Sequence, residues 1–130
     1  MTYTKYSASG NDFVIFHTFL EKDYTNDAIK LCNRTEGIGA DGLVVILPSN
    51  DADFKWLFYN SDGSYASMCG NATRAVSHYA FSNNLVKSNE IEFLTGAGLI
   101  KSCVENDIVE TQLTAPKVVK EEFIQSFLIK

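Results

Sequence analysis

One stretch, Tyr59 to Arg74, constrains the fold more than any other part of the chain. Its first residues end a strand-like segment, and Asn60-Ser61-Asp62-Gly63 then has the composition of a tight turn. Asn and Asp bond their own backbone in such turns, and Gly accepts positive φ. The sequence therefore predicts a turn followed by a helix that begins at Cys69. The apolar residues that follow have the spacing of one helix face: Ala72, Ala75, Val76, Tyr79 and Ala80.

The predicted start of this helix brings a thiol and a set of free backbone N–H groups to one position. The N–H groups of Gly70 and Asn71 can bind an anion there, for instance a substrate carboxylate. Cys69 feels the positive end of the helix dipole, which favours its thiolate form. The rest of the helix carries small side chains, with Arg74 as the only formally charged one. We therefore expect other elements to enclose the helix.

Short strand-like segments separated by turns make up most of the remaining chain. A short helix ending at Cys32 is expected, capped by Thr25 or Asn26. Ser9-Gly10-Asn11-Asp12 reads as a turn between the first two strands. The fold class is α+β, one mixed sheet of seven or eight strands wrapped around the Cys69 helix. The expected strands cover residues 3–8, 13–17, 43–48, 53–59, 90–95, 99–105 and 108–114.

Length and charge exclude several classes of protein. A chain of 130 residues is about one domain, and 11 basic against 16 acidic residues give a net charge of −5. This balance argues against a nucleic-acid partner. The most apolar early run, residues 13–20, is too short to span a membrane. Three widely spaced cysteines and no signal-peptide pattern predict a reduced, cytoplasmic protein.

Three glycines at positions 37, 39 and 42 match the spacing of a dinucleotide-binding fingerprint. That fingerprint needs a strand before it and a helix after it. Here a helix is expected before it, and the β-branched segment 43–48 after it. The inverted order rules against nucleotide binding, so the glycines are expected to permit tight turns and close backbone approach.

The chemistry available to Cys69 is narrow. A thiol hydrolase needs a histidine base, and His17 lies in a predicted strand while His78 lies far along the same helix. No metal-ligand spacing or C-x-x-C motif occurs, and Cys32 and Cys103 are expected to be structural. General acid–base catalysis remains, which suggests proton removal at an amino-acid α-carbon. A peroxidatic or redox-sensing thiol is the alternative.

Four motifs follow one another in the first half of the chain: Ser9-Gly10-Asn11-Asp12-Phe13-Val14, Gly37-Ile38-Gly39-Ala40-Asp41-Gly42, Asn60-Ser61-Asp62-Gly63-Ser64 and Met68-Cys69-Gly70-Asn71. In that order they resemble the N-terminal half of diaminopimelate epimerase. The resemblance implies a cofactor-independent epimerase that interconverts LL- and meso-diaminopimelate for lysine and peptidoglycan synthesis. It also implies two pseudo-symmetric domains, each a barrel-like sheet around a central helix.

Individual site residues follow from the same resemblance. Cys69 matches one of the family's two catalytic cysteines, which works as thiolate base in one direction and thiol acid in the other. Gly70 and Asn71 match the helix-end residues that hold the substrate α-carboxylate. Asn11 and Asn60 match substrate-contacting asparagines.

Two departures from the family pattern stand out. Some members have a substrate-contacting glutamine where this chain has Gly42, so that contact is expected to be absent. Members are also longer, with the second catalytic cysteine in a second domain, and neither Cys32 nor Cys103 lies in a matching motif. We therefore expect residues 1–115 to form the N-terminal epimerase domain, with 116–130 leading toward a missing C-terminal domain.

The expected partners are a small amino-acid substrate and that missing domain. Two alternatives remain open at this stage. The chain could act as a related carbon-acid racemase or isomerase of the same fold. It could instead be a non-catalytic domain that only binds or self-associates, including a homodimer with two facing Cys69 residues.

Overall fold

A single curled sheet joins every strand in the computed structural model, which describes residues 2–66, 68–114 and 122–128. The strands lie side by side in chain order, from β1 to β8. The β2–β3 and β4–β5 pairs are parallel and the other pairs are antiparallel, so the sheet is mixed. The elements are β1 Thr4–Ala8, β2 Asn11–His17, α1 Thr25–Cys32, β3 Gly42–Leu47, β4 Phe54–Asn60, α2 Gly70–Ser82, β5 Glu90–Thr95, β6 Gly98–Glu105, β7 Ile108–Thr114 and β8 Glu122–Leu128.

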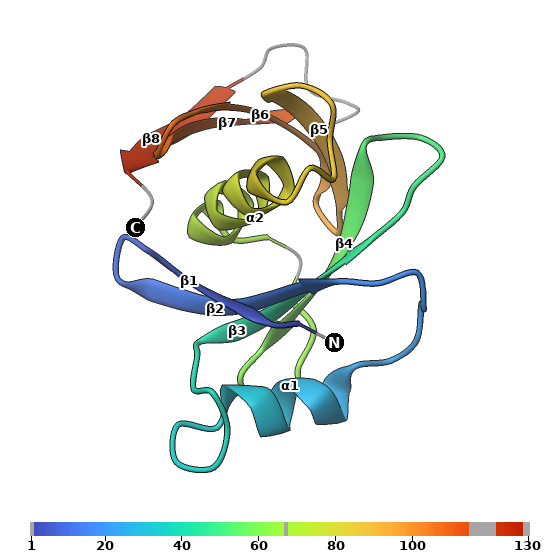
Figure 1. Cartoon of the computed structure of the whole chain (residues 1–130), viewed down its shortest axis with the longest axis vertical. Coiled ribbons are helices and arrows are strands. Elements are labelled where there is room, and N and C mark those ends of the chain that lie inside the picture. The colour runs from blue at the N-terminus through green and yellow to red at the C-terminus, as the bar shows by residue number, and fades with distance from the viewer. Residues whose placement is uncertain (1, 67, 115–121, 129–130) are drawn as a thin grey trace.

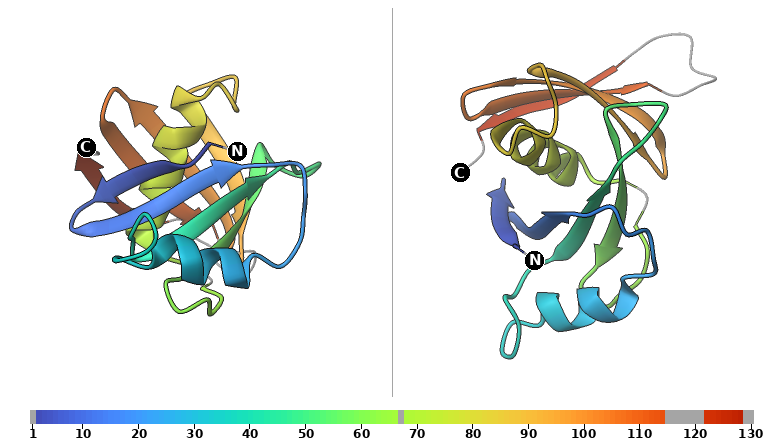
Figure 2. Two further views of the ribbon diagram at one scale, coloured as in Figure 1. Left: turned by 60° about the horizontal axis from the view of Figure 1, so that its bottom comes forward. Right: turned by 45° about the vertical axis from the view of Figure 1, so that its right-hand side comes forward.

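The sheet curls around α2, as the sequence predicts. Figure 1 shows α2 between the strands β1–β3 on one side and β5–β8 on the other, and the right-hand view of Figure 2 shows the same enclosure. Eight residues of α2 are buried, and Ala72, Ala75 and Ala80 among them are fully inaccessible. These small side chains let the sheet approach the helix backbone closely. The predicted α+β fold is confirmed.

Two hydrophobic cores lie on opposite faces of the first strands. The larger lies between the sheet and α2 and contains Phe13, Ile15 and Val44. The smaller lies under α1 and contains the alternating neighbours Val14 and Phe16. β3 is buried along its whole length because it serves both cores. Its β-branched and leucine-rich sequence matches a strand covered on both faces.

Two local expectations need correction. The residue that caps α1 is Tyr24, because the Thr25 hydroxyl donates to Asp23 Oδ1 at 2.6 Å instead of capping the helix. The first turn contains only Ser9 and Gly10, whose φ angles are 51° and 89°. Two consecutive positive φ angles suit a two-residue hairpin turn, so β2 already begins at Asn11.

The backbone of residues 122–128 forms β8, which pairs antiparallel with β7 and extends the sheet by one strand. The expected connection over 116–130 therefore contains a strand where it is described. Residues 115–121 and 129–130 lie outside the described part of the chain. The domain boundary at residue 115 remains a prediction.

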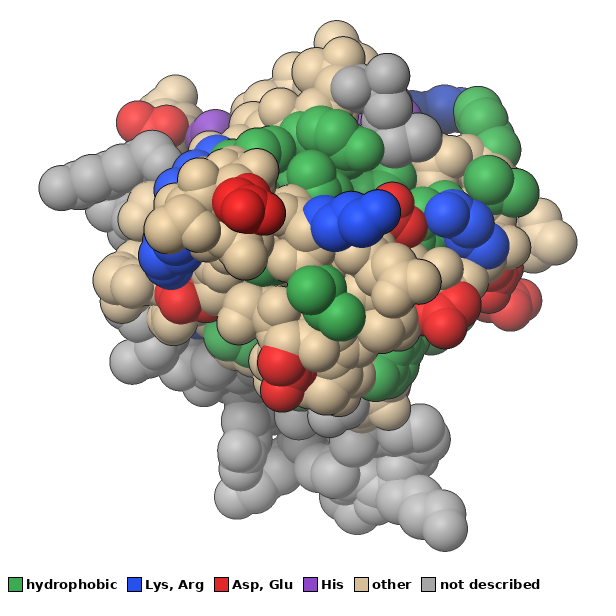
Figure 3. Space-filling view, turned by 90° about the horizontal axis from the view of Figure 1, so that it is seen from below, with side chains coloured by type: hydrophobic (Ala, Val, Ile, Leu, Met, Phe, Trp, Pro, Cys, Tyr) green, Lys and Arg blue, Asp and Glu red, His purple; other side chains and the backbone are tan. Residues whose placement is uncertain are grey.

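Charged side chains of both signs lie on the surface of the chain. On the face that carries α1, acidic and basic side chains are interspersed (Figure 3). Neither helix in the described ranges is long and apolar enough to cross a membrane.

Candidate functional site

Cys69 is the N-cap residue of α2, where the sequence predicts the helix to begin. Its backbone is extended, with φ −155° and ψ 123°, and its carbonyl accepts the N–H of Thr73 at 3.0 Å. The N–H groups of Gly70 and Asn71 precede this first helical bond and carry the positive end of the helix dipole. The first turn contains no acidic side chain that would neutralise it. The Cys69 side chain is half-buried against the larger core.

The Asn71 side chain links the helix to the start of β2. Its Nδ2 donates to Asn11 Oδ1 at 2.6 Å, and Asn11 Nδ2 donates to Asp41 Oδ2 at 3.2 Å. Asn11 opens β2, and Asp41 immediately precedes β3. Two of the predicted substrate residues therefore contact each other beside Cys69, although they are 60 positions apart in the chain.

Asn60 is the last residue of β4 and lies at the same end of the strands as Asn11 and Asp41. It lies opposite Gly42 in the β3–β4 register, and Gly42 lies opposite Phe13 in the β2–β3 register. The Asn60 side chain donates to Ser64 Oγ at 3.0 Å, inside the turn that the sequence predicts. The start of β2, the start of β3 and the end of β4 therefore lie at the same end of these strands, next to the N-terminus of α2.

An ionic cluster next to Asn11 was not predicted. Arg34 donates two hydrogen bonds to Asp12, at 2.9 and 3.0 Å, and one to Asp41 at 3.2 Å. The Arg34 hydrogen bond is the main reason why the pKa of Asp12 lies well below its ordinary value. Lys5 lies 3.4 Å from Asp12. Asp12 and Asp41 both occur in the family motifs, which was the available signal.

Arg74, the only formally charged side chain of α2, is a second functional candidate. It is 1% exposed, and its Nη2 donates to Asn71 Oδ1. Burial lowers the pKa of the Arg74 guanidinium to about 10, and the electrostatic interaction with Cys69 acts in the opposite direction. A buried cation is therefore hydrogen-bonded to Asn71, in the first turn of α2.

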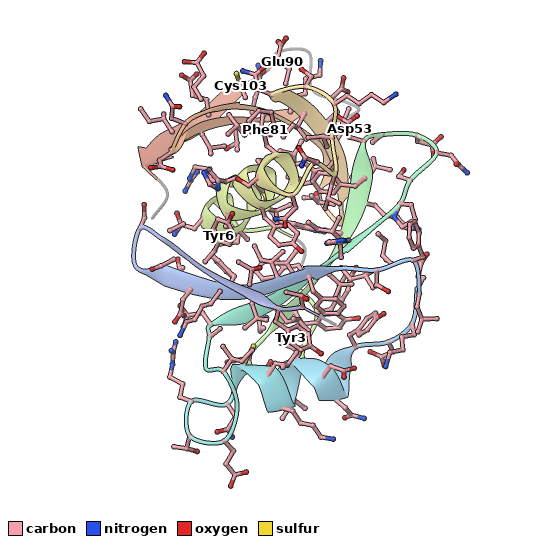
Figure 4. All side chains as sticks on the ribbon, in the orientation of Figure 1. Tyr3, Tyr6, Asp53, Phe81, Glu90 and Cys103 are labelled. Carbon is pink, nitrogen blue, oxygen red and sulfur yellow. The ribbon has the colours of Figure 1, made fainter. Side chains whose placement is uncertain are left out.

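The three cysteines occupy three different environments. Cys32 is buried in the smaller core beneath α1, and burial raises the pKa of its thiol to about 11. Cys103 and Glu90 lie on the outer side of the sheet, away from α2 (Figure 4). Neither thiol lies with Cys69 between the sheet and α2.

Both histidines contact groups other than Cys69. His17 Nδ1 lies 2.7 Å from the Tyr79 hydroxyl, and His78 Nδ1 lies 2.9 Å from the Tyr6 hydroxyl. His78 Nε2 also lies 3.3 Å from Asp107. None of these three contacts involves Cys69. Within the described residues no group of three or more His, Cys, Asp or Glu side chains could hold a metal ion.

Two cavities lie away from the candidate residues. One of about 560 Å³ on the outer face is lined by Asp53, Glu90, Lys101 and Cys103, among others. Another, of about 290 Å³, lies near Phe19 and Leu85, beyond the C-terminal end of α2. The candidate residues line neither of these cavities and lie instead at the strand ends next to the N-terminus of α2.

Known proteins resemble the chain in sequence over almost its whole length. Residues 3–119 match the family model described as diaminopimelate epimerase. The diaminopimelate epimerase of a Nitratiruptor species is 59% identical over 118 residues, which are 91% of this chain and 47% of that protein. That of Campylobacter lari is 58% identical over 123 residues, covering 95% of this chain and 49% of that protein. The chain spans about half the length of the curated relatives it matches.

Solved structures share the fold at low sequence identity. A PhzF-family phenazine biosynthesis protein of Enterococcus faecalis has a TM-score of 0.70 and 13% identity, covering 85% of this chain and 42% of that one. A hydroxyproline epimerase of Agrobacterium vitis has a TM-score of 0.69 and 12% identity, covering 86% and 41%. At such identities the likeness concerns the fold alone.

Proposed function

The chain belongs to the diaminopimelate epimerase family, and from this we propose that it supplies one of the two domains of an enzyme that interconverts LL- and meso-diaminopimelate. The observation that carries the proposal is the position of Cys69. It caps an enclosed helix, and Asn71 of the same helix end is hydrogen-bonded to Asn11. The site thus combines a candidate base with candidate ligands for an amino acid.

The N-terminal end of α2 suits the substrate α-carboxylate. The N–H groups of Gly70 and Asn71 lie at the positive end of the helix dipole. A carboxylate bound there directs the adjacent α-carbon toward the Cys69 side chain. Asn11 and Asn60 lie at the same end of strands β2 and β4, where they can hydrogen-bond the rest of the substrate.

The proposed reaction is a proton exchange at the α-carbon. The Cys69 thiolate takes the α-proton and becomes a thiol, and the electron pair left on carbon spreads into the α-carboxylate. The helix N–H groups stabilise this developing charge. An acid on the missing domain then delivers a proton to the opposite face, so one C–H bond breaks and one forms with inverted configuration. No cofactor takes part in either step.

A full-length chimera tests this function. Residues of this chain replace the matched N-terminal half of the Nitratiruptor enzyme, and formation of meso- from LL-diaminopimelate is followed in heavy water. We expect turnover with deuterium at the α-carbon, abolished by Cys69→Ala. Cys103→Ser, on the outer face of the sheet, is the matched control and should keep the activity.

The isolated chain is measured beside the chimera. Deuterium uptake without inversion would indicate one competent half-site, and inversion would indicate that two copies complete each other. A folded chimera that processes proline or another carbon acid but not diaminopimelate would favour the related-racemase alternative. Turnover that persists in the Cys69→Ala chimera would refute the proposed role of Cys69.

A further inference from the structure

We propose that the buried Arg74 is a positioning residue of this site, which orients the Asn71 and Asn11 amides and holds a positive charge close to the Cys69 end of α2. The inference rests on the proposed function for its meaning. Its evidence is the hydrogen bonding and burial of residues in this chain. Arg74 is little more than one turn along α2 from Cys69 and is 1% exposed.

The hydrogen bonds of Arg74 and Asn71 have a defined direction. A guanidinium has only donors, so the Asn71 atom that faces Arg74 must be the oxygen Oδ1. The Asn71 Nδ2 group is therefore directed at Asn11, where it donates to Oδ1 at 2.6 Å. The orientation of one amide thus determines the orientation of the next.

The other end of this series is an acceptor-only group. Asn11 Nδ2 donates to Asp41 Oδ2 at 3.2 Å, and a carboxylate can only accept. Two amides that could otherwise rotate by half a turn lie between a donor-only cation and an acceptor-only anion. Each amide consequently has one defined orientation at the N-terminal end of α2.

The positive charge of Arg74 is a second reason to assign it this role. Among the side chains of α2, Arg74 is the only formally positive one at neutral pH, and it is enclosed between the helix and the sheet. A cation shielded from water acts more strongly on a nearby charge than an exposed one does. Arg74 follows Cys69 by five residues, so its positive charge adds to the field of the helix dipole at this end of α2.

The test measures two properties that do not require epimerase activity. The first is the rate at which iodoacetamide alkylates Cys69 at neutral pH, followed by peptide mass spectrometry with Cys103 as internal reference. The second is the NMR chemical shift of the side-chain amides of Asn71 and Asn11. Both use the chain as it is, so failure of the proposed function would not affect them.

Arg74→Met should slow alkylation of Cys69 by roughly tenfold and shift both amide signals, because it removes the charge and the donor. Arg74→Lys should restore most of the rate, since an ammonium is also a donor-only cation. Val76→Ala, in the same helix and core, is the matched control and should leave both readouts unchanged.

Two results would overturn the proposal. One is a folded Arg74→Met variant with unchanged alkylation and unchanged amide signals. The other is equal behaviour of the Met, Lys and Val76→Ala variants, which would mean that Arg74 only fills space. If Arg74→Met does not fold, Arg74→Gln replaces it, because Gln is polar but uncharged.

Discussion

Single buried residues determine how this domain responds to pH. The Cys32 thiol lies in the smaller core, where burial raises its pKa to about 11. The unfolded chain loses this proton at lower pH than the folded chain does. The stabilising effect is therefore complete below the ordinary thiol pKa and disappears as the pH rises through the folded value.

We predict that between pH 9 and pH 11 the wild-type chain loses about 2 kcal/mol more unfolding free energy than Cys32→Ala does. Urea unfolding at a series of pH values, followed by the fluorescence of Trp56, measures this difference. Parallel stability curves for the two proteins across this range would show that Cys32 does not couple to folding.

Gly42 shows why one family contact cannot be restored by substitution alone. A Cβ atom at this position would lie 2.9 Å from the Tyr59 carbonyl oxygen and 2.9 Å from the Phe58 ring. The first of these is backbone and cannot rotate away. Gly42→Gln is therefore expected to lower the unfolding free energy by about 2 kcal/mol. Denaturant unfolding would reveal the loss, and an unchanged midpoint would contradict the packing argument.

At the scale of elements, the Arg34–Asp12 pair joins the first hairpin to the loop that precedes β3. Arg34 makes two hydrogen bonds to Asp12, which lowers the pKa of that carboxyl. A lowered folded pKa gives a stabilisation that is present above the ordinary carboxyl range and is lost as the pH falls.

Asp12→Asn is consequently expected to be less stable than the wild type at pH 7, with the difference shrinking as the pH falls below about 4. Asp27→Asn is the control, because Asp27 and its partner Lys22 are both strongly exposed. Thermal unfolding across this pH range would measure both variants. A difference that stays constant down to the lowest pH would exclude the ion pair as its cause.

The elements themselves could largely be predicted from the sequence, because local patterns specify them. The segment 43–48 is apolar and β-branched, and the alanine-rich stretch after Cys69 has helical spacing. The parallel pairing of β2 with β3 could not be predicted, because it joins segments separated by a whole helix and leaves no local pattern. The Arg34–Asp12–Asp41 cluster depends on that pairing, so it was missed as well.

The candidate site divides in the same way. Cys69 and the helix N-terminus are local features, and the sequence predicts both. The hydrogen bond between Asn71 and Asn11 and the burial of Arg74 depend on the closed sheet. Motif resemblance named Asn11 and Asn71 without indicating that they contact each other.

At the scale of the whole molecule, the predicted domain boundary at residue 115 can be tested by truncation. We predict that a chain ending at residue 115 still unfolds cooperatively, because the described members of both cores come from residues up to Val109. Its stability should fall, since β7 loses the β8 partner. Far-ultraviolet circular dichroism and Trp56 fluorescence should report coincident transitions. A truncated chain with no transition would place β8 within the minimal domain.

The hydrogen bond between Asn11 and Asn71 also bears on how the molecule folds. It joins residues 60 positions apart, and the chain between them includes the parallel pairing of β2 with β3. Contacts so distant in the chain form only after the entropy of the intervening loop has been overcome, which slows folding. We therefore expect the site to become complete late in folding, together with the closed sheet, so that a partly folded chain carries the Cys69 thiol without its oriented amides.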